Sequence, residues 1–271
     1  MELKNKNIVV TGAASGIGRA LAHAFTSEGA RVVISDRDHD RMEETASEIG
    51  AKAMTCDVKR EQDIQELVAF ANRTHGPVDL FCSNAGICRG EPGNAASADN
   101  SVWQACWDIH VMAHVYAARA VLPDMIERGG GYLLQVASAA GLLSQIGDAA
   151  YSASKHAAVG FAESLAISHG DDGIRVSVLC PQYVATPMLG VDDQGGHESH
   201  PGLLTPEQVA ETTLQGIQDE RFLILPHPEV EQYLKFKAAD HDRWLSGMRK
   251  LRRKIVRQTG STRLQEMYKL V

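Results

Sequence analysis

The chain has 271 residues, of which 44% are hydrophobic and 23% charged, a composition that is ordinary for a globular protein. Its formal net charge of −7 argues against a general nucleic-acid binder. No apolar run approaches the roughly 18 residues that a bilayer span needs, and residues 1–6 lack the layout of a signal peptide. The five cysteines show no metal-type spacing. We therefore expect a cytoplasmic protein without a metal site, whose cysteines stay reduced.

Short apolar runs alternate with longer amphipathic stretches along most of the chain. The runs lack polar alternation, as strands covered on both faces do, and they occupy 8–11, 31–35, 53–56, 78–83, 131–137, 175–180 and 222–225. Between them, apolar residues at helical spacing predict helices over 17–27, 41–49, 61–73, 102–128, 151–168 and 206–218. This order predicts an α/β fold, a doubly wound parallel sheet of about seven strands. We expect a single Rossmann-type domain over residues 1–271, with a core at 4–226 and a C-terminal helical extension at 227–271.

Two segments depart from this alternation. Residues 186–205 are polar and contain glycine, which predicts a mobile loop. In the C-terminal extension, apolar or half-apolar positions from Val230 to Ile255 recur at steps of three and four, which predicts one helix face. Residues 226–271 hold eleven Lys and Arg against five Asp and Glu, a net charge of +6, so the rest of the chain carries −13. The extension can cover a substrate opening, form an oligomer interface or present a solvated face, and contact with membrane lipids is a weaker alternative.

The first predicted strand is joined to the first predicted helix by a glycine-rich stretch, Thr11-Gly12-Ala13-Ala14-Ser15-Gly16-Ile17-Gly18. Gly12 and Gly16 permit a tight turn and close backbone approach, and Gly18 lets the helix pack closely on the strand. The N-terminus of the helix offers N–H groups and a favourable dipole to a pyrophosphate. In this context the pattern predicts a dinucleotide site that includes Ser15 and Ile17.

Acidic residues follow the next two predicted strands. Asp36 can accept hydrogen bonds from the ribose hydroxyls of an adenosine, and its charge would repel a 2′-phosphate, which favours NAD over NADP. Arg37 follows directly and offers a phosphate partner, so it weakens that preference. Asp57 and Val58 end the third strand, where an adenine ring would lie, although Asp57 also fits a solvated turn.

Candidate chemical groups follow the fourth and fifth predicted strands. The small residues Asn84-Ala85-Gly86 let the backbone pass close to a cofactor. Tyr151 and Lys155 share one face of the next helix, one turn apart. A phenol, whose pKa is about 10, becomes a usable acid or base near neutral pH when an ammonium lowers that pKa. Ser138 can hold a substrate oxygen against Tyr151.

On these residues the sequence resembles the short-chain dehydrogenase/reductase family over roughly residues 4–226. The resemblance rests on the glycine stretch at 11–18, Asn84-Ala85-Gly86, Ser138 and Tyr151-x-x-x-Lys155, in the family's order and spacing. It implies hydride transfer at a nicotinamide, with Lys155 bonded to the nicotinamide ribose. It also implies that Val184 and Thr186, after Pro181, contact the nicotinamide end, and that the protein is a homodimer or homotetramer built on the helices at 102–128 and 151–169.

Two positions depart from the family pattern. His110 stands where most members have an asparagine that positions a water linking the lysine to solvent. Because histidine donates and accepts hydrogen bonds and titrates near neutrality, one hypothesis is that His110 keeps this proton relay and makes it pH-sensitive; the alternative is a packed residue. Gln182 follows Pro181 where the family has glycine, and it either restricts the substrate or faces solvent.

By resemblance, the substrate walls come from the segments after Asn84-Ala85-Gly86 and Ser138 and from residues 182–204. Their mainly apolar side chains predict an apolar secondary alcohol or ketone, cyclic or aromatic, that contacts Ser138, Leu142, Gln145, Tyr151, Gln182 and Met188. We therefore predict NAD-dependent oxidation of such an alcohol. Two alternatives stay open, which are a non-catalytic NAD-binding redox sensor or scaffold and an NADPH-dependent ketone reductase.

Overall fold

A parallel sheet of seven strands forms the centre of the computed structural model, which describes residues 1–191 and 200–270. The strand order is β3-β2-β1-β4-β5-β6-β9, and the strands are β1 (Asn7–Thr11), β2 (Arg31–Ser35), β3 (Lys52–Ala53), β4 (Leu80–Ser83), β5 (Gly131–Val136), β6 (Ile174–Leu179) and β9 (Leu223–Ile224). This architecture confirms the predicted doubly wound α/β fold. The order reverses between β1 and β4, which is where such sheets bind ligands at their carboxyl ends.

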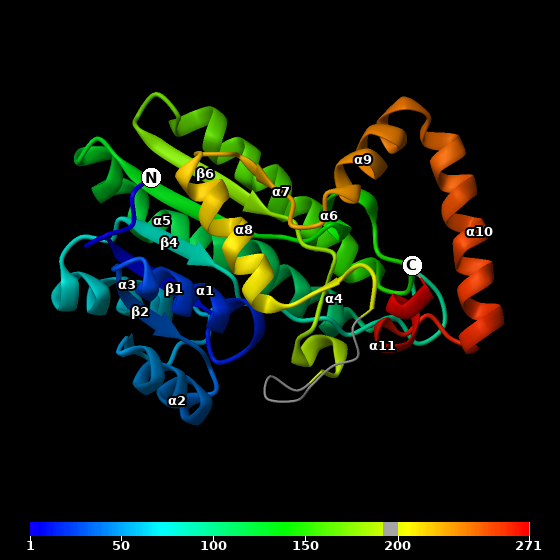
Figure 1. The fold of residues 1–271 in the computed structure, drawn as a ribbon, viewed down its shortest axis with the longest axis horizontal. Coiled ribbons are helices and arrows are strands. Elements are labelled where there is room, and N and C mark those ends of the chain that lie inside the picture. The colour runs from blue at the N-terminus through cyan, green and yellow to red at the C-terminus, as the bar shows by residue number, and fades with distance from the viewer. Residues whose placement is uncertain (192–199, 271) are drawn as a thin grey trace.

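Helices cover both faces of the sheet, so that the central strands are buried on two sides (Figure 1). One face packs against α1 (Gly16–Ser27), α2 (His39–Ile49) and α8 (Pro206–Gln218). The other packs against α3 (Glu61–His75), α5 (Ala113–Glu127) and α7 (Ala149–His169). Alternate strand residues enter the two cores, as Val10 and Val9 of β1 do, and this explains the continuous apolar runs.

The helix predicted over 102–128 is present but is not uniform. It consists of α4 (Asn100–Trp107), a π-helical turn at Asp108–Met112, and α5. A π turn holds one residue more than the α-helical pattern, and such turns occur often at functional sites. The hydrophobic periodicity does not reveal it, because apolar residues continue across the turn.

The segment expected to be a mobile loop at 186–205 is ordered where the structure describes it. A short 3-10 helix covers Pro187–Leu189, and β7 (Tyr183–Val184) pairs in parallel with β8 (Leu203–Leu204). The two ends of the segment are thereby held side by side. Residues 192–199, which include Gly195 and Gly196 of the predicted loop, lie outside the described residues.

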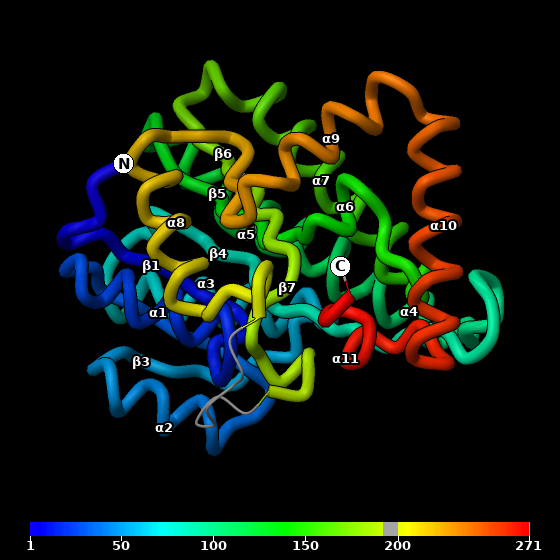
Figure 2. The backbone as a smooth tube through the Cα atoms, turned by 45° about the vertical axis from the view of Figure 1, so that its right-hand side comes forward, coloured from blue at the N-terminus to red at the C-terminus, as the bar shows by residue number. Residues whose placement is uncertain are grey.

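The C-terminal extension contains two long helices and not the single helix that the apolar stripe suggested. These are α9 (Glu229–Ala239) and α10 (His241–Thr259), and they are followed by α11 (Leu264–Met267) and a 3-10 turn at Tyr268–Leu270. The helical conformation is interrupted at Asp240, whose carboxylate caps α10 by accepting from the Arg243 N–H at 2.9 Å. Figures 1 and 2 show α9 and α10 projecting from the sheet domain, and α11 returning toward it. Among the described residues, no helix combines the length and hydropathy of a membrane span.

Candidate active site

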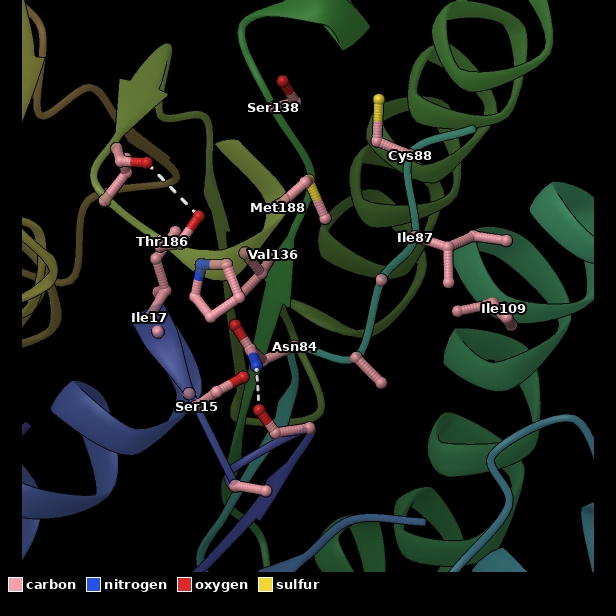
Figure 3. Close-up of a pocket in the computed structure, with 18 of the residues that line it drawn as sticks. Ser15, Ile17, Asn84, Ile87, Cys88, Ile109, Val136, Ser138, Thr186 and Met188 are labelled. Atoms are coloured by element: carbon pink, nitrogen blue, oxygen red, sulfur yellow. Dashed lines mark hydrogen bonds between the residues drawn. The ribbon is translucent and has the colours of Figure 1, made fainter. Parts of the chain in front are cut away.

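A cavity of about 560 Å³ opens at the carboxyl ends of the central strands. All but two of the predicted site residues line it, namely Gly12, Ser15, Gly16, Ile17, Gly18, Asp36, Arg37, Asp57, Val58, Asn84, Ala85, Gly86, Ser138, Gln145, Tyr151, Lys155, Pro181, Gln182, Val184, Thr186 and Met188. The two exceptions are His110 and Leu142. Figure 3 shows Thr186 on one side of the cavity, Ile87 and Cys88 on the other, and Met188 between them.

The glycine stretch forms the floor of one end of this cavity. Gly12 has a φ of +66°, and a Cβ there would lie 2.7 Å from the Ala85 Cα, so both backbone conformation and space require glycine. The Asn84 side chain fixes the turn by donating to the carbonyls of Thr11 and Gly12 at 2.9 and 3.0 Å. The turn then leads into α1, whose N-cap Ser15 makes no side-chain capping bond within the described residues. Such a turn and helix start fit a pyrophosphate.

Asp36 lies at the tip of β2, beside this turn. Three backbone N–H groups hold its carboxylate: those of Ala14 at 3.1 Å, Arg37 at 2.7 Å and Asp38 at 3.1 Å. The carboxylate is therefore fixed in position and lines the cavity, as a ribose-binding group requires. Together with the glycine floor, this arrangement fits an adenine dinucleotide.

Basic side chains stand near Asp36 as well. Arg37 and Lys59 line the same end of the cavity. The Lys59 ammonium lies 3.5 Å from the Asp57 carboxylate, which ties it to the turn after β3. A 2′-phosphate would therefore meet cations here in addition to Asp36, so this end of the cavity does not exclude NADP by charge alone.

The chemical end of the cavity combines α7 with the segment after β5. Tyr151 and Lys155 both start from α7, and the Lys155 Nζ lies 5.6 Å from the centre of the Tyr151 ring. Lys155 is 3% exposed, and its ammonium donates to the Val136 carbonyl at 2.9 Å. Ser138 directs its hydroxyl into a tight turn after β5, where the Ala140 N–H donates to it at 3.1 Å. All three residues line the cavity, and the Ser138 hydroxyl lies close enough to the Tyr151 phenol to act on its pKa.

Burial dominates the protonation of this trio in the protein alone. It lowers the pKa of Lys155 from 10.5 to about 8, because the ammonium loses its water. It also raises the pKa of Tyr151 well above 10, and the neighbouring Ser138 hydroxyl opposes this only in part. In the protein alone, the pKa of Tyr151 is therefore raised and not lowered as the spacing of Tyr151 and Lys155 suggested.

His110 does not line the cavity. It is fully buried in the π turn, where its Nε2 accepts from the Ile87 N–H at 3.0 Å and its Nδ1 lies 2.8 Å from the Ser154 hydroxyl. An accepting Nε2 places the proton of the neutral ring on Nδ1, which donates to Ser154, and Ser154 donates to the Tyr151 carbonyl. Its ring also contacts the Tyr151 ring edge-to-face at 5.3 Å. His110 thus ties the loop after β4 to the Tyr151 helix.

The electrostatics of His110 differ from the expectation. Burial, and then the charge of Lys155, hold its pKa well below 6.5. A group with so low a pKa stays neutral across the physiological range. His110 therefore does not provide the titration near neutral pH that the hypothesis of a pH-sensitive relay requires.

Asp148 was not among the predicted site residues, although it is the N-cap of α7, the helix that carries Tyr151 and Lys155. Its carboxylate caps α7 by accepting from the Tyr151 N–H at 3.0 Å. The same group accepts from the N–H groups of Arg89 at 3.2 Å and Gly90 at 2.7 Å, and from the Cys88 thiol at 3.3 Å. Asp148 is 2% exposed, so one buried carboxylate joins the cavity wall at 88–90 to the helix of Tyr151.

His227 is a second residue that the sequence did not reveal. It is 1% exposed, and its Nδ1 accepts from the Gln182 N–H at 3.1 Å. Its Nε2 lies 3.1 Å from the Tyr183 carbonyl and 3.2 Å from that of Gly202, to which it donates. One neutral imidazole therefore holds both ends of the segment that carries Met188. Gln182, the departure from the family's glycine, lines the cavity at this point.

Leu142 is the second predicted residue that lies away from the cavity. It belongs to α6 (Ala140–Leu143) and packs in a cluster with Val230 and Trp244 of the extension. Its direction follows from the short helix after Ser138, which turns Leu142 outward. Gln145 does line the cavity, but its amide nitrogen already donates to the Ile146 carbonyl at 3.1 Å. Within the described residues, no cluster of His, Cys, Asp or Glu fits a metal ion.

The fold is a Rossmann-type α/β fold whose cavity fits an adenine dinucleotide, and comparison with known proteins gives its family. The model of the family described as "short chain dehydrogenase" matches residues 6–195, so the chain belongs to the short-chain dehydrogenases.

Relatives and solved structures agree with this family. The chain is 34% identical to oxidoreductase UcpA of Salmonella typhimurium, over 91% of this chain and 92% of the relative. It is also 34% identical to 1-deoxy-11-beta-hydroxypentalenate dehydrogenase of Streptomyces exfoliatus, over 87% and 88%. A short-chain dehydrogenase/reductase from Burkholderia phymatum, solved in complex with NAD, superposes with a TM-score of 0.79 at 27% identity, covering 89% of this chain and 96% of that one.

Proposed function

We propose that the protein oxidises a secondary alcohol to a ketone with NAD, and catalyses the reverse reaction. The observation that carries this proposal is that Ser138, Tyr151 and Lys155 meet in the same cavity as the glycine stretch and Asp36. Because these acid/base residues lie in the same cavity as the expected dinucleotide site, an enzyme is favoured over a protein that only binds NAD. The similarity to a dehydrogenase of a hydroxypentalenate supports an alcohol as substrate.

Each of the three side chains has a separate role in this proposal. Ser138 holds the substrate oxygen by a hydrogen bond, and Tyr151 accepts the alcohol proton. Lys155 favours the phenolate by its positive charge and binds the nicotinamide ribose. Bound NAD supplies the hydride acceptor, together with a positive charge on its ring. Tyr151 is half-buried in the cavity wall, and a bound substrate and cofactor would cover its remaining exposed surface, so that the proton would pass between fixed partners.

Replacement of Tyr151 tests this mechanism. We expect Tyr151→Phe to lose turnover of every alcohol by at least about a thousandfold while its Kd for NAD stays within twofold, since the phenol oxygen acts on the substrate. Reduction of NAD would be followed by absorbance across small, cyclic, bicyclic and aromatic secondary alcohols, and binding by fluorescence titration. Turnover close to that of the wild type in Tyr151→Phe would refute the mechanism.

NAD is the cofactor that we propose, on the position of Asp36. Its fixed carboxylate offers acceptors to ribose hydroxyls and repels a 2′-phosphate, whereas Arg37 favours that phosphate. We expect Asp36→Ala to lower affinity for NAD and to raise affinity for NADP, so that their ratio moves by about a hundredfold. An unchanged ratio would contradict a discriminating role for Asp36.

We propose in addition that two or four chains assemble through the surface of α4, α5 and α7. Trp107 on α4 is 46% exposed and Ile167 on α7 is 84% exposed, and large exposed apolar side chains are common at interfaces. Light scattering after size-exclusion chromatography measures the assembly directly. A monomer at micromolar concentration would contradict this part of the proposal.

A further inference from the structure

The last ten described residues cross the substrate end of the cavity. They follow α10, lie beyond residue 195, where the match to the family ends, and include α11. Figure 2 shows this segment, in red, returning from α10 to the front of the sheet domain. The segment therefore lies outside the part of the chain that the family model matches.

The segment makes polar contacts with two separate walls of the cavity. The Gln265 amide donates to the Met188 carbonyl at 3.1 Å, in the wall that follows β7. The Gln145 amide lies 3.7 Å from the Met267 sulfur, which connects the segment to the wall that follows Ser138. Within the described residues, this segment therefore bridges the two walls across the substrate end.

Apolar packing holds the segment in place. Met267 is 1% exposed, and Ile255 of α10 is fully buried. Leu264 and Tyr268 pack against a small cluster that includes Tyr183 and Leu189. The aromatic rings of Tyr183 and Tyr268 lie 6.3 Å apart. These contacts fix the position of the segment relative to the cavity wall at Tyr183 and Leu189.

Leu264 is the residue of this segment that lines the cavity. It shares the substrate end with Met188 and Leu189, so this part of the wall is apolar on both sides. Gln265 and Glu266 are exposed, and Met267 is buried in the packing beneath. Leu264 is therefore the side chain of the segment that a substrate would touch.

We propose that Leu264 is a specificity-determining residue, which limits the bulk of the apolar part of the alcohol or ketone bound at Ser138 and Tyr151. The inference rests on the proposed function. A hydrophobic wall discriminates by about 10-fold or more for each methylene that fits or fails to fit. The helices α9 and α10 lead the chain away from the sheet and back to the cavity, where Leu264 follows them. Of the residues of α10, Trp244 and Ile255 are buried.

Substitutions that change the size of residue 264 in opposite directions test the inference. In Leu264→Ala, the ratio of kcat/KM for a bicyclic secondary alcohol to that for 2-butanol should rise at least about tenfold, and in Leu264→Phe it should fall. The Kd for NAD should stay within twofold in both. Leu245→Ala makes the same change on the exposed side of α10 and should leave the ratio unchanged.

A binding experiment separates failure of this inference from failure of the proposed function. The same alcohols would be titrated calorimetrically into NAD-saturated Tyr151→Phe protein, with leucine, alanine or phenylalanine at position 264. A ratio of affinities that follows the size of residue 264 supports the inference even if no alcohol is turned over. Ratios equal in all three proteins overturn it while turnover by the wild type stands. If the wild type neither binds nor oxidises any alcohol, both the proposed function and the inference are refuted.

Discussion

Removing the Asp148 carboxylate should destabilise the protein more than the loss of an ordinary helix cap. In Asp148→Ala, the Tyr151 N–H loses its cap, at about 1 kcal/mol. The part-buried N–H groups of Arg89 and Gly90 lose bonds to a charged acceptor, at about 1.5 kcal/mol each, which is the low end of the range. The free energy of unfolding should therefore fall by about 4 kcal/mol, which lowers Tm by about 10 °C in a chain of this size.

Asp240→Ala is the matched control for this experiment. Asp240 caps α10 in the same way, but its side chain accepts from Arg243 alone and is exposed. It should cost about 1 kcal/mol, or about 3 °C. Tm would be measured by circular dichroism, together with the KM for an alcohol, which should rise in Asp148→Ala because the wall at 88–90 is released. Equal losses of Tm in the two variants would refute a joint role for Asp148 in the helix and the wall.

Three further predictions concern buried titratable groups. Burial lowers the pKa of Lys155 to about 8, so between pH 8 and about 10 the unfolded chain binds a proton that the folded chain lacks. The free energy of unfolding, measured with urea, should therefore rise with pH in this window, and Lys155→Met should reduce that rise. Equal slopes in the two proteins would contradict the assignment. Because the pKa of His110 lies well below 6.5, His110→Asn should leave the pH–rate profile unchanged between about pH 5.5 and 8, and a lost acid limb would contradict a neutral His110. His227→Ala leaves Gln182 and Tyr183 without their partner, so stability should fall by about 3 kcal/mol and KM should rise more than kcat falls; an unchanged KM would show that His227 does not position the wall.

The cofactor end of the site could be predicted from the sequence because its requirements are local. Gly12 and Gly18 are needed by the backbone of one turn, and Asp36 stands at the end of a strand that pairs with β1 in register. Such requirements leave a pattern in consecutive residues. The same holds for Tyr151 and Lys155, which share a helix face by spacing alone.

The supporting residues could not be predicted because their partners are distant in the chain. Asp148 meets Arg89 across 59 residues, and His227 meets Gln182 across 45. As isolated letters, a helix-capping aspartate and a histidine after a proline have many ordinary explanations. Leu142 shows the converse error, since its place after Ser138 suggested the cavity while a four-residue helix turned it toward α9.

The cavity wall can be divided into two parts, one inside and one outside the residues that the family model matches. In the proposed mechanism, the chemistry depends on residues between Gly12 and Lys155, all within the segment that the family model matches. The far wall of the cavity depends on His227 and Leu264, which lie outside it. A change at Leu264 should alter which alcohol fits without disturbing Ser138, Tyr151 or Lys155, because its segment contacts the wall near Met188 and Leu189. We therefore expect reaction type and substrate choice to depend on separate parts of this chain, and the variants at Tyr151 and Leu264 should affect them independently.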